Sequence, residues 1–164
     1  MIRGAGLSRP TETMFEALEE CCNAIEECYE FMLAYAAQGL PDDAGSPSGG
    51  QLRGLLSRAV SALSGLAGTY AEAVKQEGLQ PAARYDAFLA VLDRDARDSL
   101  AAMELVLAQP SLSSQLIDNL NASIHLRALL TDLFLIDEIL KLQRIRAKAV
   151  TPDGRVKNER LPRK

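Results

Sequence analysis

Apolar residues recur at alternating steps of three and four in four long segments of this chain, and glycine or proline bounds each segment. Such spacing places apolar side chains along one side of an α-helix. The clearest seam runs through Phe15, Leu18, Cys22, Ile25, Tyr29, Met32 and Ala36. Four amphipathic helices bury such seams by packing against one another, so the pattern predicts an all-α fold.

The breakers predict four helices, over residues 13–38, 49–76, 81–109 and 112–148. Thr13 with Glu16, and Ser48 with Gln51, fit capping boxes at the first two starts. Because two of the three connections are very short, consecutive helices should be antiparallel, which predicts an up-down-up-down four-helix bundle. We expect an N-terminal extension over residues 1–12, the bundle over 13–148, and a basic, flexible C-terminal tail over 149–164.

The charge is split along the chain. Residues 141–164 hold nine of the eighteen Lys and Arg and two acids, whereas the first 140 residues hold nine bases and twenty acids. An acidic body with a basic arm is more typical of a binding protein than of an enzyme. The arm could dock a protein, contact nucleic acid through phosphates, or remain solvated. Its candidate binding residues are Arg155, Lys157, Arg160, Arg163 and Lys164.

The last predicted helix is unusually apolar. Residues 126–142 include ten large apolar side chains in seventeen positions, more than one seam can cover. Either this helix is central and wrapped by the other three, or one side of it is a surface for a partner or a second copy. Insertion into a membrane surface is disfavoured by the acids within the segment. The predicted contact residues are Leu129, Leu133, Phe134, Ile136 and Leu140.

The first predicted helix carries an acidic face, and no Lys or Arg occurs from residue 10 to residue 52. This face is either solvated or a docking surface. Neighbouring like charges repel slightly, so a basic partner that binds there would relieve the repulsion. Its residues are Glu16, Glu19, Glu20, Glu26, Glu27 and Glu30.

Side chains that could support metal or redox chemistry are few. Cys21 and Cys28 lie seven residues apart on one row with Met14, and His125 is the single histidine. Thiolates and thioethers suit soft metals, but buried cysteines also serve as small core residues. The chain contains no G-x-G-x-x-G, Walker A, H-E-x-x-H or C-x-x-C motif, so we predict no catalytic residue and no cofactor.

These features predict a non-enzymatic helical interaction module, such as an adaptor, chaperone-like protein or accessory subunit. It would bind a protein partner, or itself as a homo-oligomer, through the apolar surface of the last helix. The alternative is a metal- or ligand-binding bundle that uses the Cys, Met and His side chains; a third is a nucleic-acid-binding accessory protein that uses the tail. Three closely spaced cysteines, without a secretory signal or an apolar run long enough to span a membrane, indicate a cytoplasmic address without a membrane partner.

Overall fold

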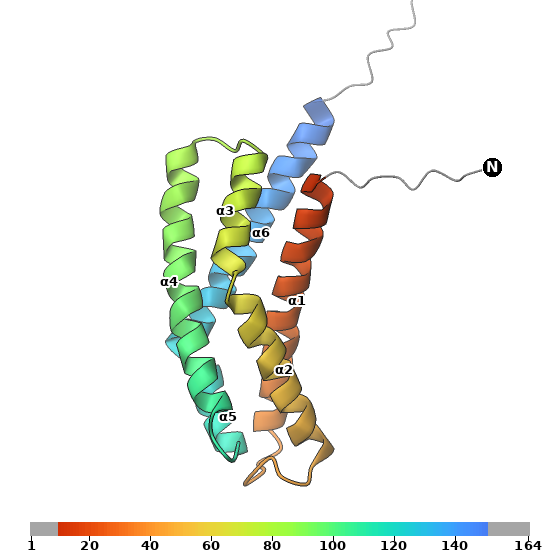
Figure 1. The fold of residues 1–164 in the computed structure, drawn as a ribbon, viewed down its shortest axis with the longest axis vertical. Coiled ribbons are helices and arrows are strands. Elements are labelled where there is room, and N and C mark those ends of the chain that lie inside the picture. Colours follow the sequence, from red (N-terminus) through yellow and green to blue (C-terminus); the bar gives the residue numbers. More distant parts are fainter. Residues whose placement is uncertain (1–9, 151–164) are drawn as a thin grey trace, which may run out of the picture. The chain divides into compact units, whose positions relative to one another are not determined.

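A computed structural model describes residues 10–150 of the chain (Figure 1). Within these residues all regular secondary structure is α-helical, which confirms the all-α prediction. The predicted up-down four-helix bundle is not confirmed, since the described chain contains six helices. They are α1 (Pro10–Ala36), α2 (Pro47–Leu63), α3 (Leu66–Gln76), α4 (Ala82–Leu107), α5 (Ser114–Asn121) and α6 (Ile124–Val150).

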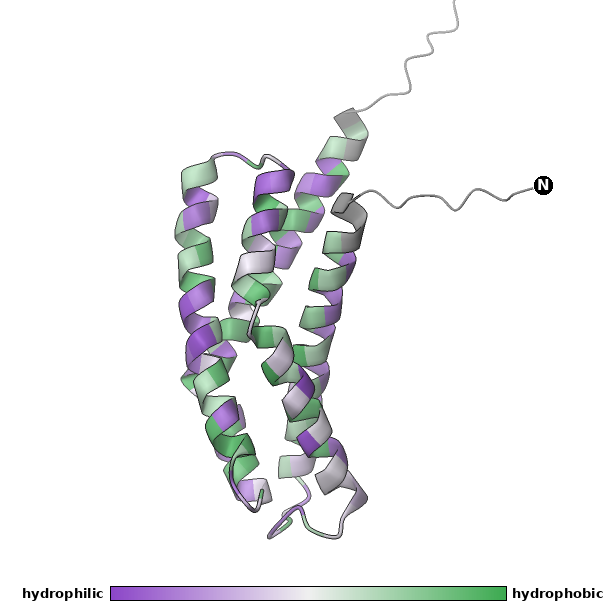
Figure 2. Ribbon diagram, in the orientation of Figure 1, coloured by the Kyte–Doolittle hydropathy of each residue, from purple (hydrophilic) through white to green (hydrophobic). Residues whose placement is uncertain are grey.

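The chain divides into two compact units after Leu133. In the first unit α1 packs against α2, α3 and α5, and α4 packs against the same three helices. Figure 1 shows α3 and α4 side by side, joined by a short connection. Figure 2 shows hydrophilic and hydrophobic residues interleaved along each of these helices, as amphipathic packing requires. The second unit begins at Phe134 and contains the C-terminal part of α6.

The predicted helix over residues 49–76 is two helices, because the chain breaks at Ser64 and Gly65. Gly65 caps the start of α3 in a non-helical conformation. Just before it, the Ser61 and Ser64 hydroxyls donate hydrogen bonds to carbonyls four residues earlier. Such bonds bend helices, and a glycine offers little resistance to a kink.

The predicted helix over residues 112–148 is also two helices. The first ends at Asn121, where the Ala122 N–H donates to the Asp118 carbonyl and the Ser123 N–H donates to the Leu120 carbonyl. The second bond spans three residues instead of four, which tightens the last turn where the helix ends. Neither glycine nor proline marks this break, which is why the residue pattern did not reveal it.

Two predicted helix starts are wrong. The first helix begins at Pro10, so Thr13 lies inside it. The second begins two residues earlier than predicted: Ser46 is the cap, its hydroxyl accepts the Gly49 N–H at 3.0 Å, and Pro47 occupies the first turn. Proline is favoured there because its missing N–H would have no helical partner.

Polar contacts join the α1–α2 and α4–α5 connections. Tyr35, which is fully buried, donates its hydroxyl to the Leu112 carbonyl at 2.8 Å. The Ser114 hydroxyl donates to the Tyr35 carbonyl at 2.7 Å and accepts the Leu40 N–H at 2.9 Å. Tyr35 and Cys28 lie seven residues apart on α1, and both are fully buried.

Arg53 of α2 extends the same network. It forms an ion pair with Asp43 and donates to the Leu107 and Gln109 carbonyls at 3.2 and 3.1 Å. The hydrogen bond from Arg53 lowers the pKa of Asp43, and the Asp43 carboxylate also accepts the Leu112 N–H at 2.7 Å. One arginine therefore satisfies carbonyls at the end of α4, where a helix leaves its last groups unpaired. Among the described residues, no helix combines the length and hydropathy needed to cross a membrane.

Candidate docking face on α6

Four of the five predicted contact residues on the last helix are buried. Leu129 and Leu133 in the first unit are 0% and 1% exposed, and Ile136 and Leu140 in the second are 1% and 4% exposed. Phe134 differs, because 57% of it is exposed. Of the predicted set, Phe134 alone is therefore accessible to a partner in this structure.

The second unit exposes three further large apolar residues that the sequence analysis did not select. Leu135, Leu142 and Ile145 are 49%, 47% and 65% exposed, close to the value for Phe134. At about 100° per residue, these four side chains fall within roughly 100° of the helix circumference. We call Phe134, Leu135, Leu142 and Ile145 the α6 docking face.

A helical projection separates the four exposed residues of the α6 docking face from the buried residues of the same segment. Buried Ile136 and Leu140 lie about 40° apart around the axis, and both point away from the direction of Phe134 and Ile145. The number of apolar residues in the sequence indicates that one seam cannot cover them all. The residue types do not show which seam is covered, because both seams consist of leucine, isoleucine or phenylalanine.

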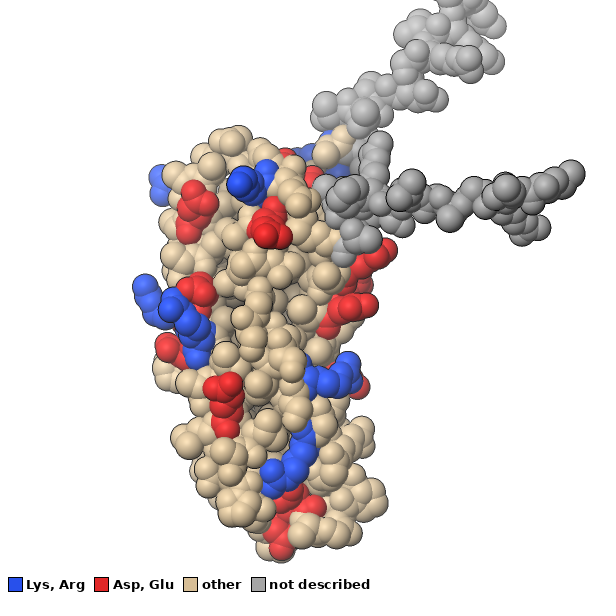
Figure 3. Space-filling model, in the orientation of Figure 1, with Lys and Arg blue, Asp and Glu red and all other residues tan. Residues whose placement is uncertain are grey.

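The predicted acidic face is on the surface of α1. Figure 3 shows acidic side chains gathered along the outer edge of this helix. Five of the six glutamates are exposed and Glu26 is half-buried. Glu27 pairs with Arg58 of α2 at 3.1 Å, so a base from the neighbouring helix offsets part of the charge. Both side chains are more than half exposed, so this pair contributes little to stability.

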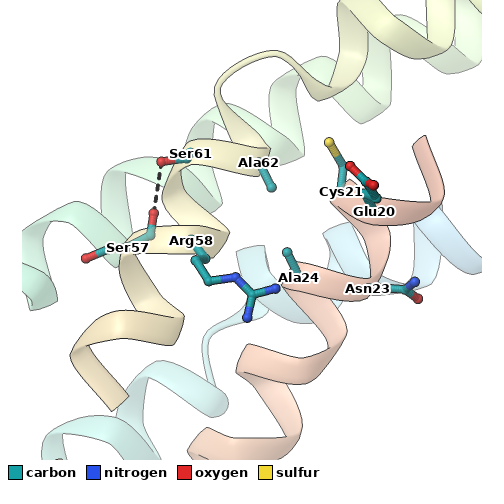
Figure 4. A pocket seen from close by; sticks show the side chains of 8 residues that line it. All are labelled: Glu20, Cys21, Asn23, Ala24, Ser57, Arg58, Ser61 and Ala62. Atoms are coloured by element: carbon teal, nitrogen blue, oxygen red, sulfur yellow. Dashed lines mark hydrogen bonds between the residues drawn. The ribbon is translucent and has the colours of Figure 1, made fainter. Parts of the chain in front are cut away.

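An open groove lies between α1 and α2, lined from α1 by Glu20, Cys21, Asn23 and Ala24 and from α2 by Ser57, Arg58, Ser61 and Ala62 (Figure 4). The Ser57 and Ser61 hydroxyls donate to backbone carbonyls of their own helix. Burial, and then the charge of Glu20, raise the pKa of Cys21. A raised pKa disfavours the thiolate, which is the nucleophilic form, so the groove holds no activated nucleophile among these residues.

The candidate metal ligands do not form a ligand set. Cys28 is fully buried, and burial followed by the charge of Glu27 raises its pKa to about 12. His125 lies on α6, where its Nδ1 atom is 3.7 Å from a carboxylate oxygen of Asp98 on α4. Within residues 10–150, no three His, Cys, Asp or Glu side chains come together as ligands for a metal ion. Half-buried Met14 stays on the Cys21 row of α1.

A carboxyl pair between α4 and α6 was not anticipated. The pKa of Asp132 is raised to about 6, first by burial and then by Asp95, which acts through a side-chain hydrogen bond to the protonated form and through charge repulsion. The Asp132 Oδ2 atom is buried without a hydrogen-bond partner. Two carboxylates cannot bond each other until one is protonated, so the pair favours a shared proton.

The predicted tail residues, from Arg155 to Lys164, lie outside the described residues. Comparisons of the chain with protein-family models, curated proteins and solved structures found no match.

Proposed function

We propose that this protein is a non-enzymatic helical interaction module, an adaptor, chaperone-like protein or accessory subunit. It binds a protein partner or itself through the α6 docking face. The observation that carries the proposal is the exposure of four large apolar side chains within twelve residues of one helix, from Phe134 to Ile145. Burying apolar surface is favourable by about 25 cal/mol per Å², so a partner that packs on this face lowers the free energy of the system.

The other exposed apolar residues do not support a competing face. Leu33 lies on α1, and Val91 and Leu105 lie fourteen residues apart on α4. Ile124 is the first residue of α6, ten residues before Phe134 and in the first unit. Single exposed hydrophobic residues are ordinary on protein surfaces, whereas a contiguous row indicates a binding site. The α6 docking face is therefore the stronger candidate.

The metal-binding alternative has less support. Its most buried ligand, Cys28, has a pKa of about 12, and binding a metal would require that thiol to lose its proton inside the core. The nucleic-acid alternative depends on the tail, and no observation on residues 10–150 favours it.

The direct test is Phe134→Glu, with Leu105→Glu as its matched control. Leu105 is 67% exposed, similar to Phe134, but it lies on α4 and not on α6. We expect Phe134→Glu to remain folded by circular dichroism and to lose self-association or partner binding at least tenfold, because a charge would be buried in the contact. Leu105→Glu should behave like the parent protein.

Subunit number should be read by native mass spectrometry and sedimentation velocity over a range of concentrations. If the parent protein is a monomer, its partners should be isolated and then rebound, as purified proteins, to the parent and to both variants. A folded Phe134→Glu protein with unchanged assembly and unchanged partner binding would overturn the proposal.

A further inference from the structure

The exposed side of α6 carries four residues whose spacing is the same from both ends, with an acid and a base in the two middle positions. Phe134, Glu138, Lys141 and Ile145 follow one another at steps of four, three and four residues, and all four are exposed. At 100° per residue they fall within about 60° of the circumference, so they form one line along the helix. The order along this line is apolar, acidic, basic, apolar.

We propose that the occupant of the α6 docking face is α6 of a second copy of this chain, packed antiparallel and centred between residues 139 and 140. This inference rests on the proposed function and specifies its partner. In this register Phe134 packs on the partner subunit's Ile145, and Glu138 pairs with the partner subunit's Lys141. A two-fold axis repeats each contact, as an isologous interface requires.

Charge selects this direction over the parallel one. In a parallel pair, Glu138 would face the partner subunit's Glu138, and Lys141 would face the partner subunit's Lys141. Like charges placed opposite each other in an interface are unfavourable, whereas the antiparallel pair replaces both repulsions with two ion pairs.

The flanking leucines favour the same direction. Leu135 and Leu142 lie about 20° apart around the helix, on one side of the line. The two-fold axis of an antiparallel pair is perpendicular to both helices, so these leucines from both copies fall on the same side of the seam and cluster. In a parallel pair the axis runs along the helices and would place the two leucine pairs on opposite sides.

The contact is small, since each copy contributes one face of a segment of about twelve residues. Interfaces of this size lie below the standard range for stable complexes. We therefore expect a dimer that dissociates at roughly micromolar concentration and that has exchangeable subunits.

A charge-swap cycle tests the register. Glu138→Lys and Lys141→Glu alone should each raise the dimer Kd about tenfold in low salt, because each creates two like-charge contacts. The double variant restores both ion pairs in reversed order, so its Kd should return to within about threefold of the parent value. Near 0.5 M salt the effect of each single variant should shrink. Glu104→Lys, an exposed charge change on α4, is the matched control and should leave the Kd unchanged.

Disulfide capture gives a second measurement. The antiparallel register places the two copies of residue 134 about 16 Å apart, and brings residue 134 beside the partner subunit's residue 145. Phe134→Cys combined with Ile145→Cys should therefore cross-link on mild oxidation. Neither single variant should cross-link above the background of the parent protein.

The outcomes separate this inference from the proposed function. If Phe134→Glu dissociates the dimer but the double charge swap fails to restore it, or if single Phe134→Cys cross-links, the antiparallel register is wrong and the docking face stands. If the parent protein is a monomer up to about millimolar concentration yet loses a partner with Phe134→Glu, the second copy is not the occupant. If Phe134→Glu changes neither assembly nor partner binding, both proposals fall.

Discussion

Replacing Asp132 by Asn should make the protein more stable at neutral pH. Asp132 lies between α4 and α6 beside Asp95, with one carboxylate oxygen buried and unbonded. Above its pKa both carboxylates are charged and repel each other. An Asn side chain removes one charge and supplies an N–H that can donate to Asp95.

The magnitude follows from the pKa. Burial and Asp95 raise the pKa of Asp132 from 3.8 to about 6. At about 1.4 kcal/mol per pKa unit, this shift would correspond to roughly 3 kcal/mol of destabilisation at neutral pH if the side chain were fully buried. Asp132 is only half-buried and solvent screens part of this cost, so we expect Asp132→Asn to stabilise the fold by about 1–2 kcal/mol.

The effect should depend on pH with a definite sign. Between pH 3.8 and about 6 the folded state holds a proton on Asp132 that the unfolded state has released. The parent protein therefore gains stability from this group as pH falls through that window, and loses it as pH rises. At pH 4 Asp132 is protonated in the folded state and resembles Asn, so the advantage of the variant should nearly vanish.

The assay is urea unfolding of both proteins at several values between pH 4 and pH 7.5. Taking the difference at each pH cancels the contribution of groups common to both proteins, including the nearby Asp98 and His125 pair. Glu104→Gln removes an exposed carboxylate from α4 and should change stability by less than about 0.5 kcal/mol. The reasoning is refuted if Asp132→Asn is no more stable than the parent at pH 7.5, or if its advantage does not shrink toward pH 4.

Two further substitutions test the network that joins the connections. Arg53→Ala should lower the free energy of unfolding, measured in urea, by about 2 kcal/mol. The substitution leaves Asp43 part-buried without its ion pair and leaves two carbonyls without a donor. An unchanged urea midpoint would show that the network does not contribute to stability. Gly49→Ala should lower the free energy of unfolding by at least about 2 kcal/mol in the same assay, since the added Cβ would overlap the Asp43 carbonyl. In the control Gly50→Ala the added Cβ meets nothing within 4 Å, so this variant should be neutral or stabilising. Equal effects of the two substitutions would contradict this packing.

The helical fold could be predicted from the sequence because helix periodicity is a local property. Apolar residues at alternating three- and four-residue steps identified the inner faces, and members such as Ile25, Leu56 and Leu92 are buried. Proline and glycine placed the long connections, because their backbone preferences act without help from tertiary contacts.

The helix breaks at Ser64–Gly65 and at Ala122 could not be predicted in this way. Serine, alanine and an isolated glycine can each continue a helix or end it according to what the next segment packs against, so local preference does not decide the outcome. The interactions of Arg53 could not be predicted from the sequence either, because its partners lie ten residues before it and more than fifty residues after it.

On α6 the sequence by itself determined that there was more apolar surface than one seam could use, and the tertiary structure decided which side is covered. Periodicity fixes the angle between Phe134 and Ile136 around the helix, because that angle depends only on the backbone. Which of the two is exposed depends on the surroundings of the whole helix, and a helix with apolar residues on two sides contains no local signal that distinguishes them.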